Sequence, residues 1–226
     1  MITALLGSIA AAVLAHSGST GHGGVSASTL VTVTVIGVLV GVRLLGVTAK
    51  FAPNRHRVLF VCAVPVVWIG ALLREGATAV LPVWLFLSAV GVTVAVIDVR
   101  TKRIPKVITR WAYLGGVPLV VAAGLIEHDP VALRRAALAG VVFFLGYLAL
   151  SAATHGGMGM GDVRLAGVLG MVLGYAGWRQ VYLGALTPFL LAFVVAVLLY
   201  RWRGHRAAAF GPYMVAGCAV SLGWLG

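Results

Sequence analysis

The chain carries only five carboxylates in 226 residues, and two of them occupy unusual positions. Asp98 closes the apolar run that starts at Val90, and Asp162 opens another run at Val163. Ionisable groups at such depth in a membrane are costly, so they indicate a functional site by default. The other three fall in short predicted external loops, where a solvated charge needs no special explanation: Glu75, Glu127 and Asp129.

Two carboxylates that meet can hydrolyse a peptide bond, one acting as base and the other as acid. Like charges a few ångströms apart cannot both ionise, so such a pair shares a proton. Any pKa then belongs to the pair, and the sequence does not assign the base to Asp98 or to Asp162. Each acid also has a structural alternative. Asp162 can cap the helix that follows it, and Asp98 can pair with Arg100 or Lys102.

Composition decides the class of protein that carries these acids. The chain is 61% hydrophobic and 10% charged, with a mean hydropathy of +1.06. Soluble domains have about 45–50% apolar and about 25% charged residues. A soluble domain of this size exposes too much surface to hide so many apolar side chains. The composition therefore excludes a soluble globular domain and a disordered tail, and it predicts an integral membrane protein.

The apolar runs predict an all-α polytopic transmembrane helical bundle of eight or nine spans. A span needs roughly 20 apolar residues, and a lipid-exposed backbone must satisfy its hydrogen bonds within a helix. Residues 1–15 form a short first run that could also be a cleaved signal peptide. The predicted runs lie near residues 1–15, 27–48, 58–73, 77–97, 107–126, 133–153, 163–178, 180–200 and 208–225.

The basic residues predict the orientation of this bundle. One set of alternate loops holds thirteen of the 17 Lys and Arg residues, and the positive-inside rule places that set in the cytoplasm. Asp98 and Asp162 then share the cytoplasmic face, and Arg134–Arg135 on the outer face fits the scheme least well. Because basic loops also meet anionic headgroups, the net charge of +12 predicts contact with the lipid bilayer, and no nucleic-acid partner is expected.

The sequences around the two acids carry a family resemblance. Gly159-Met-Gly-Asp162, continued by Val163-Arg-Leu-Ala166, resembles the GxGD signature of the type IV prepilin peptidases. Asp98, followed by Ile104-Pro105, resembles the site of that family's first aspartate. Two predicted spans separate the sites, as in the family and in its archaeal preflagellin relatives. Phe210-Gly-Pro-Tyr213 in the last predicted span also resembles a family feature.

The resemblance implies a catalytic transmembrane domain over residues 85–226, preceded by N-terminal spans in residues 1–84. It implies an aspartic endopeptidase of the bacterial cytoplasmic (inner) membrane, with Asp98 and Asp162 catalytic and the active site facing the cytoplasm. Its partner would be a prepilin or pseudopilin precursor, from which it removes a short basic leader. Long family members carry paired CxxC motifs in an N-terminal cytoplasmic insert and N-methylate the mature pilin. Residues 1–84 hold one cysteine and no such insert, so N-methyltransferase activity is not expected.

Three further residues are predicted to bind or position the substrate. Gly159 and Gly161 lack a Cβ, so a substrate backbone can approach them closely. Pro212 lacks an N–H, which would free the carbonyl of Ala208 to pair with an extended substrate segment; a helix kink for packing is the alternative.

No cofactor is required by this chemistry, and no metal site is predicted. The two cysteines form no CxxC pair, no HExxH motif occurs, and the six histidines are scattered. Two other functions remain open from the sequence. One is a small ion- or proton-coupled membrane transporter that uses the same two aspartates, and the other is an inactive scaffold for pilus assembly.

Overall fold

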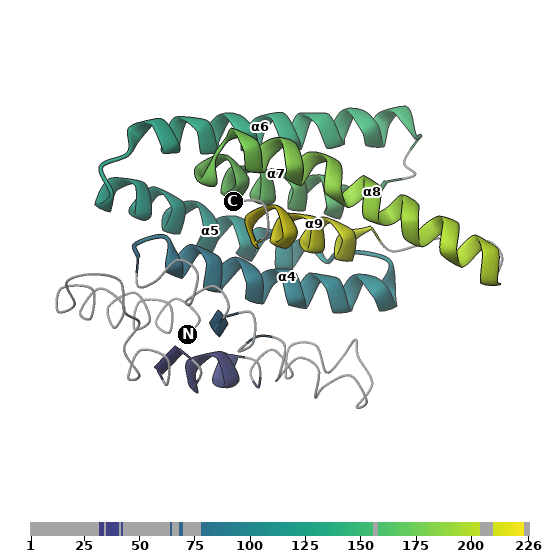
Figure 1. Ribbon diagram of the computed structural model, residues 1–226, viewed down its shortest axis with the longest axis horizontal. Coiled ribbons are helices and arrows are strands. Elements are labelled where there is room, and N and C mark those ends of the chain that lie inside the picture. Colours follow the sequence, from purple (N-terminus) through teal and green to yellow (C-terminus); the bar gives the residue numbers. More distant parts are fainter. Residues whose placement is uncertain are drawn as a thin grey trace. The chain divides into compact units, whose positions relative to one another are not determined.

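The computed structural model describes residues 32–33, 35–40, 42, 64, 68–69, 78–155, 158–203 and 210–223. Figure 1 labels the helices α4 to α9 of this part; residues 32–33, 35–40, 42, 64 and 68–69 are helical too, and no strand occurs among the described residues. The all-α prediction is confirmed there. The helices are α4 (Leu81–Thr101), α5 (Lys106–Ile126), α6 (Pro130–Ala153), α7 (Met160–Ala176), α8 (Trp178–Arg203) and α9 (Gly211–Gly223).

Four of these helices are long and apolar enough to cross a membrane: Leu81–Val99, Lys106–Ile126, Pro130–Ala153 and Trp178–Leu198. They match the runs predicted near 77–97, 107–126, 133–153 and 180–200 to within a few residues. The apolar part of α9, Gly211–Leu222, is shorter, and α7 has 17 residues. The first three predicted runs lie largely outside the described residues, so the total of eight or nine spans stays a prediction.

The chain divides into two compact units, one of residues 1–93 with 114–128 and one of residues 94–113 with 129–226. Each unit therefore takes part of α4 and part of α5. The functional division between residues 1–84 and 85–226 stays a prediction.

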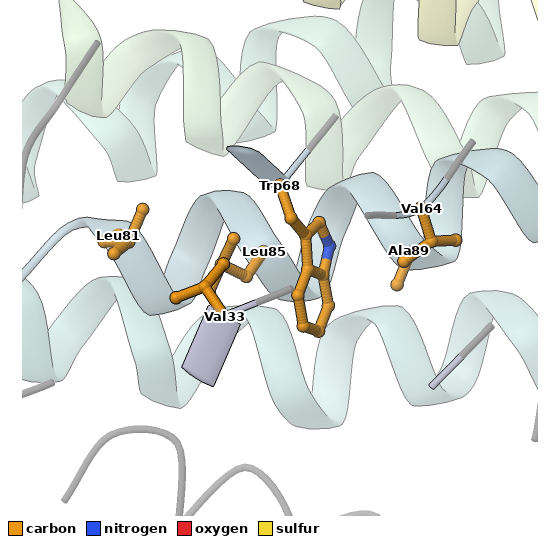
Figure 2. Packing of buried hydrophobic residues seen from close by; sticks show 6 residues of the cluster. All are labelled: Val33, Val64, Trp68, Leu81, Leu85 and Ala89. Carbon is orange, nitrogen blue, oxygen red and sulfur yellow. The ribbon is translucent and has the colours of Figure 1, made fainter. Parts of the chain in front are cut away.

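The core of the first unit lies against one face of α4. Leu81, Leu85 and Ala89 are spaced four residues apart, so they share that face, and each is less than 9% exposed. Figure 2 shows the ring of Trp68 lying close to these side chains, and its indole Nε1 donates a hydrogen bond to Ser88 Oγ over 3.0 Å. This bond satisfies the polar atom of an otherwise apolar cluster.

In the second unit α7 is the buried helix, in contact with α6, α8 and α9. Small residues allow the close packing of α6 on α7. A Cβ on Gly170 would lie 2.7 Å from the Ala139 carbonyl oxygen, and one on Gly174 would lie 2.9 Å from the Ala136 Cα. Helices that present a small residue every four positions can approach closely in membranes, where lipid supplies no hydrophobic drive for association.

Arg135 of α6 explains why a basic pair occurs on the predicted outer face. Its guanidinium donates hydrogen bonds to the carbonyl oxygens of Gly174 and Tyr175, with 2.7 Å to the latter. These carbonyls belong to the last turn of α7, where no helical N–H remains to pair with them. Arg135 therefore caps a helix, whereas its neighbour Arg134 is exposed.

Candidate active site

Asp98 lies in the last turn of α4 and is only 3% exposed. The helix ends three residues later, because Lys102 adopts a left-handed conformation with φ 51° while its N–H still bonds the Asp98 carbonyl over 2.8 Å. Pro105, which has no N–H to donate, then precedes the first residue of α5. The motif Asp98-x5-Ile-Pro is thus a helix end, a short turn and a helix start.

The Asp98 carboxylate is held by the start of α9. Its Oδ2 accepts a hydrogen bond from the backbone N–H of Gly211 at 2.8 Å, and the pair is buried. A Cβ on Gly211 would lie 2.8 Å from the same oxygen, closer than real Cβ contacts allow. Gly211 was not among the predicted site residues, although it belongs to the stretch Phe210–Tyr213 that the sequence singled out.

Pro212 lies beside this bond, but its place in the helix differs from the expectation. Since α9 begins at Gly211, Pro212 occupies the first turn, where a missing N–H leaves no helical bond unmade. Ala208, whose carbonyl Pro212 was expected to free, lies outside the described residues. A proline in the first turn of a helix needs no kink, and the role of Pro212 in positioning the substrate stays a prediction.

Asp162 lies in the first turn of α7, ahead of the apolar run 163–178. Gly159 is the N-cap, with φ −68° and ψ 141°, and its carbonyl accepts the Asp162 N–H over 3.0 Å. The Asp162 Oδ1 atom is buried and has no hydrogen-bond partner among the described residues. Burial, and after it the charge of Asp98, raises the pKa of Asp162 to about 6, while the Gly159 N–H acts in the opposite direction. The two aspartates therefore interact electrostatically across α4 and α7.

A glycine contact joins the two motifs directly. A Cβ on Gly161 would lie 2.7 Å from the Ile104 Cβ and 3.0 Å from the Ile104 carbonyl oxygen. Only a residue without a side chain fits against this turn, so Gly161 brings the segment after Asp98 against the segment before Asp162. Gly159 is less confined, because the nearest atom to its Cβ position is Asp162 Oδ2 at 3.2 Å.

Three aromatic side chains cluster next to Gly211, and of these only Phe210 belongs to a stretch that the sequence singled out. The ring centroid of Tyr147 in α6 lies 6.3 Å from that of Phe210, which precedes Gly211. Phe189 of α8 completes a three-ring cluster, with its centroid 5.4 Å from Phe210 and 5.7 Å from Tyr147. Tyr147 interacts electrostatically with Asp162. The sequence signal that could have pointed to Tyr147 is the buried stripe of α6, in which it follows Ala139 and Phe143 at helical spacing.

The sequence that carries these residues is similar to that of known proteins. A sequence profile of the type IV leader peptidase family matches residues 84–201, just over half of the chain. The chain belongs to the type IV leader peptidase family. The matched range includes Asp98, Ile104, Gly159, Gly161 and Asp162, and it ends before α9.

Three curated relatives of this chain share the name "Prepilin leader peptidase/N-methyltransferase". The protein from Bacillus subtilis is 32% identical over 141 residues, which cover 62% of this chain and 54% of the relative. Those from Escherichia coli and Burkholderia pseudomallei are each 30% identical and cover 59% and 68% of this chain. The chain spans between 50% and 59% of the length of these relatives. No solved structure matches the chain.

The structure thus brings together four of the five predicted site residues in the second unit. Asp98 and Asp162 interact, Gly161 packs against Ile104, and Gly159 caps the helix that carries Asp162. Pro212 follows Gly211, the residue that binds Asp98. Among the described hydrogen bonds, none joins Pro212 to either acid. Within the described residues no group of three or more His, Cys, Asp or Glu gathers to hold a metal ion.

Proposed function

We propose that the chain is a membrane aspartic endopeptidase that cleaves the leader from prepilin or pseudopilin precursors, with Asp98 and Asp162 as its catalytic pair. The observation that carries the proposal is the packing of Gly161 against Ile104, which brings the two aspartate motifs together in a member of the type IV leader peptidase family. Enzymes concentrate perturbed carboxyl groups at their active sites. A buried carboxylate oxygen without a partner, Asp162 Oδ1, is also suited to bind water or a substrate atom.

The mechanism uses one ionised and one protonated aspartate. The ionised carboxylate takes a proton from a water molecule held between the pair, and the water oxygen attacks the scissile carbonyl carbon. The protonated carboxyl donates to the carbonyl oxygen, which gives a gem-diol. Collapse of the gem-diol breaks the C–N bond as the leaving nitrogen takes up a proton, and the pair again shares one proton.

The proposed substrate is a precursor with a short basic leader, a small residue before the cut and an apolar helix after it. The basic loops of the chain do not attract such a leader, so binding depends on the apolar segment and on backbone contacts. We place the protein in the bacterial cytoplasmic membrane with the site facing the cytoplasm, in accordance with the thirteen basic residues of that predicted side.

Co-expression with such a precursor tests the proposal. The wild-type chain should convert the precursor to its mature form, and Asp98→Asn and Asp162→Asn should each lower the cleavage rate by roughly 1,000-fold or more, since the two groups act as a unit. The matched control is Asp129→Asn. Asp129 is exposed, and its Oδ1 caps α6 by accepting the Ala132 N–H over 2.8 Å, a bond that the asparagine oxygen retains.

The outcomes separate the proposed peptidase from the alternatives. Full cleavage by either aspartate variant would remove that residue from the catalytic pair. A wild-type chain that accumulates in the membrane and leaves the precursor intact would favour the scaffold. Proton or cation flux in proteoliposomes, lost in both aspartate variants, would favour the transporter.

A further inference from the structure

Ser151 ends the buried stripe of α6, and its hydroxyl reaches out of the helix. The side chain is 7% exposed, and its Oγ donates a hydrogen bond to the carbonyl oxygen of Met158 over 2.9 Å. Most hydroxyl groups near a helix end bond to carbonyls of their own helix, so this bond to the following segment is informative.

The bonded carbonyl leads directly into the candidate site. The C–N bond of Met158 joins it to Gly159, the N-cap of α7. The Gly159 carbonyl in turn accepts hydrogen bonds from the N–H groups of Asp162 and Val163, over 3.0 Å and 3.3 Å. Two consecutive carbonyls are thus fixed, one by α6 and one by α7. The orientation of the first turn of α7, and of Asp162 on it, depends on both.

We propose that Ser151 is a positioning residue for Asp162, acting through the Met158 carbonyl. The backbone before Asp162 needs an external contact to fix it, because Gly159 and Gly161 restrict its φ and ψ angles less than other residues would. The inference rests on the proposed function, in which the carboxyl of Asp162 must meet water and substrate within a few tenths of an ångström.

Thr154, three residues further along, offers a matched control in the same helix end. It is exposed, and its Oγ1 bonds to the carbonyls of Leu150 and Ser151 over 2.9 Å and 3.2 Å, both of them in α6. Removing this hydroxyl changes α6 locally and does not touch the segment that enters α7. Ser151→Ala and Thr154→Val each delete one hydroxyl of the same helix end, but only the Ser151 hydroxyl bonds to the segment that enters α7.

The first measurement is steady-state cleavage of a purified precursor with a basic leader and an apolar helix, using the full chain in lipid nanodiscs. Ser151→Ala should lower kcat by roughly 10- to 100-fold with KM unchanged, because a displaced carboxyl affects the chemical step. Ser151→Thr keeps the hydroxyl and should restore kcat to within about three-fold of the wild type. Thr154→Val should match the wild type in both parameters.

The second measurement needs no activity. Labelling Met carbonyl carbons with ¹³C and Gly nitrogens with ¹⁵N selects Met-Gly pairs, and the chain has only two, Met158–Gly159 and Met160–Gly161. Solid-state NMR then gives two correlation peaks, both from the candidate site. Ser151→Ala should move the Met158 carbonyl shift, because that oxygen loses its donor, and Thr154→Val should leave both peaks in place.

The two measurements separate failure of this inference from failure of the proposed function. An unmoved Met158 peak in Ser151→Ala, or a kcat equal to that of the wild type, would overturn the positioning role. If the wild type cleaves no precursor, the peptidase proposal fails, and the Met158 peak alone then decides whether Ser151 fixes the segment before Asp162.

Discussion

The backbone amide of Gly211 donates a 2.8 Å hydrogen bond to Asp98 Oδ2, although the two residues are 113 positions apart. The bond ties the end of α4 to the start of α9. Because an amide N–H can only donate, it orients the carboxylate of Asp98 and fixes which of its oxygens faces away from α9. The geometry of the candidate pair therefore depends on a residue outside both aspartate motifs.

The first prediction concerns Gly211→Ala. The added Cβ would lie 2.8 Å from Asp98 Oδ2 and 3.3 Å from its Cγ, so the carboxylate or the start of α9 must shift. We expect the cleavage rate to fall by about 10-fold or more, since displacement of a catalytic group by one ångström can cost about 100-fold. The measurement is precursor cleavage by purified protein in nanodiscs.

Gly146→Ala is the control for this substitution. Gly146 lies on α6, and a Cβ there would meet no atom of the described residues within 4 Å. Alanine in place of glycine also favours a helix, so this variant should cleave like the wild type and unfold at the same or a higher temperature. A Gly211→Ala protein with the wild-type rate would show that the Asp98 carboxylate tolerates displacement from the Gly211 amide.

The second prediction ranks the two glycines of the Gly-x-Gly-Asp motif. Gly161→Ala should impair cleavage and stability, because its Cβ would meet the Cβ and the carbonyl oxygen of Ile104, and neither atom can rotate away. Gly159→Ala should be milder, with Asp162 Oδ2 at 3.2 Å as its nearest contact. Adding Ile104→Ala should not rescue Gly161→Ala, since alanine keeps both clashing atoms. Equal rates for the two glycine variants would contradict the ranking.

The sequence was sufficient to predict the helices and the pair of acids, for identifiable reasons. Apolar runs near 20 residues have one stable form in lipid, so α4, α5, α6 and α8 were found to within a few residues. Asp98 and Asp162 were conspicuous because charges are rare and costly in such a chain.

The contacts that position these acids were not predictable in the same way. Gly211 acts through its backbone N–H, which every residue except proline possesses, so its type did not reveal the bond. The sequence does not show whether a serine such as Ser151 only packs in the helix or binds a carbonyl of the following segment, as Ser151 does. Asp129 was interpreted as a solvated loop charge, although the pair Asp129-Pro130 is a common helix start, and it caps α6.

The third prediction concerns the stability supplied by Arg135. Its hydrogen bonds to the Gly174 and Tyr175 carbonyls involve a charged donor, and such bonds contribute about 1.5–3 kcal/mol. We expect Arg135→Ala to lower the free energy of unfolding by about 2 kcal/mol. The exposed Arg134→Ala should change it by less than about 0.5 kcal/mol. Equal unfolding temperatures for the two variants in nanodiscs would argue against the cap.

The fourth prediction concerns methylation. The sequence has two cysteines and no CxxC pair, whereas the relatives are named both as peptidases and as N-methyltransferases. The profile match begins at residue 84, so it does not cover the residues in which N-terminal spans are predicted. We expect the mature product of this chain acting alone to keep an unmethylated amino terminus. Mass spectrometry of that product checks this, and a methylated terminus would assign the second activity to the chain.

The fifth prediction is a pH dependence of stability that originates at Asp162. An aspartate carboxyl in the unfolded chain has a pKa of about 3.9. In the folded chain, burial and the charge of Asp98 raise the pKa of Asp162 to about 6. Between these values the folded chain binds more protons, so its free energy of unfolding falls as the pH rises from about 4 to about 6. Asp162→Asn removes this uptake. The unfolding temperature of Asp162→Asn minus that of the wild type should therefore increase as the pH rises from about 4 to about 6. Asp129→Asn should follow the wild type. A constant difference between the Asp162→Asn variant and the wild type across the interval would contradict the assignment.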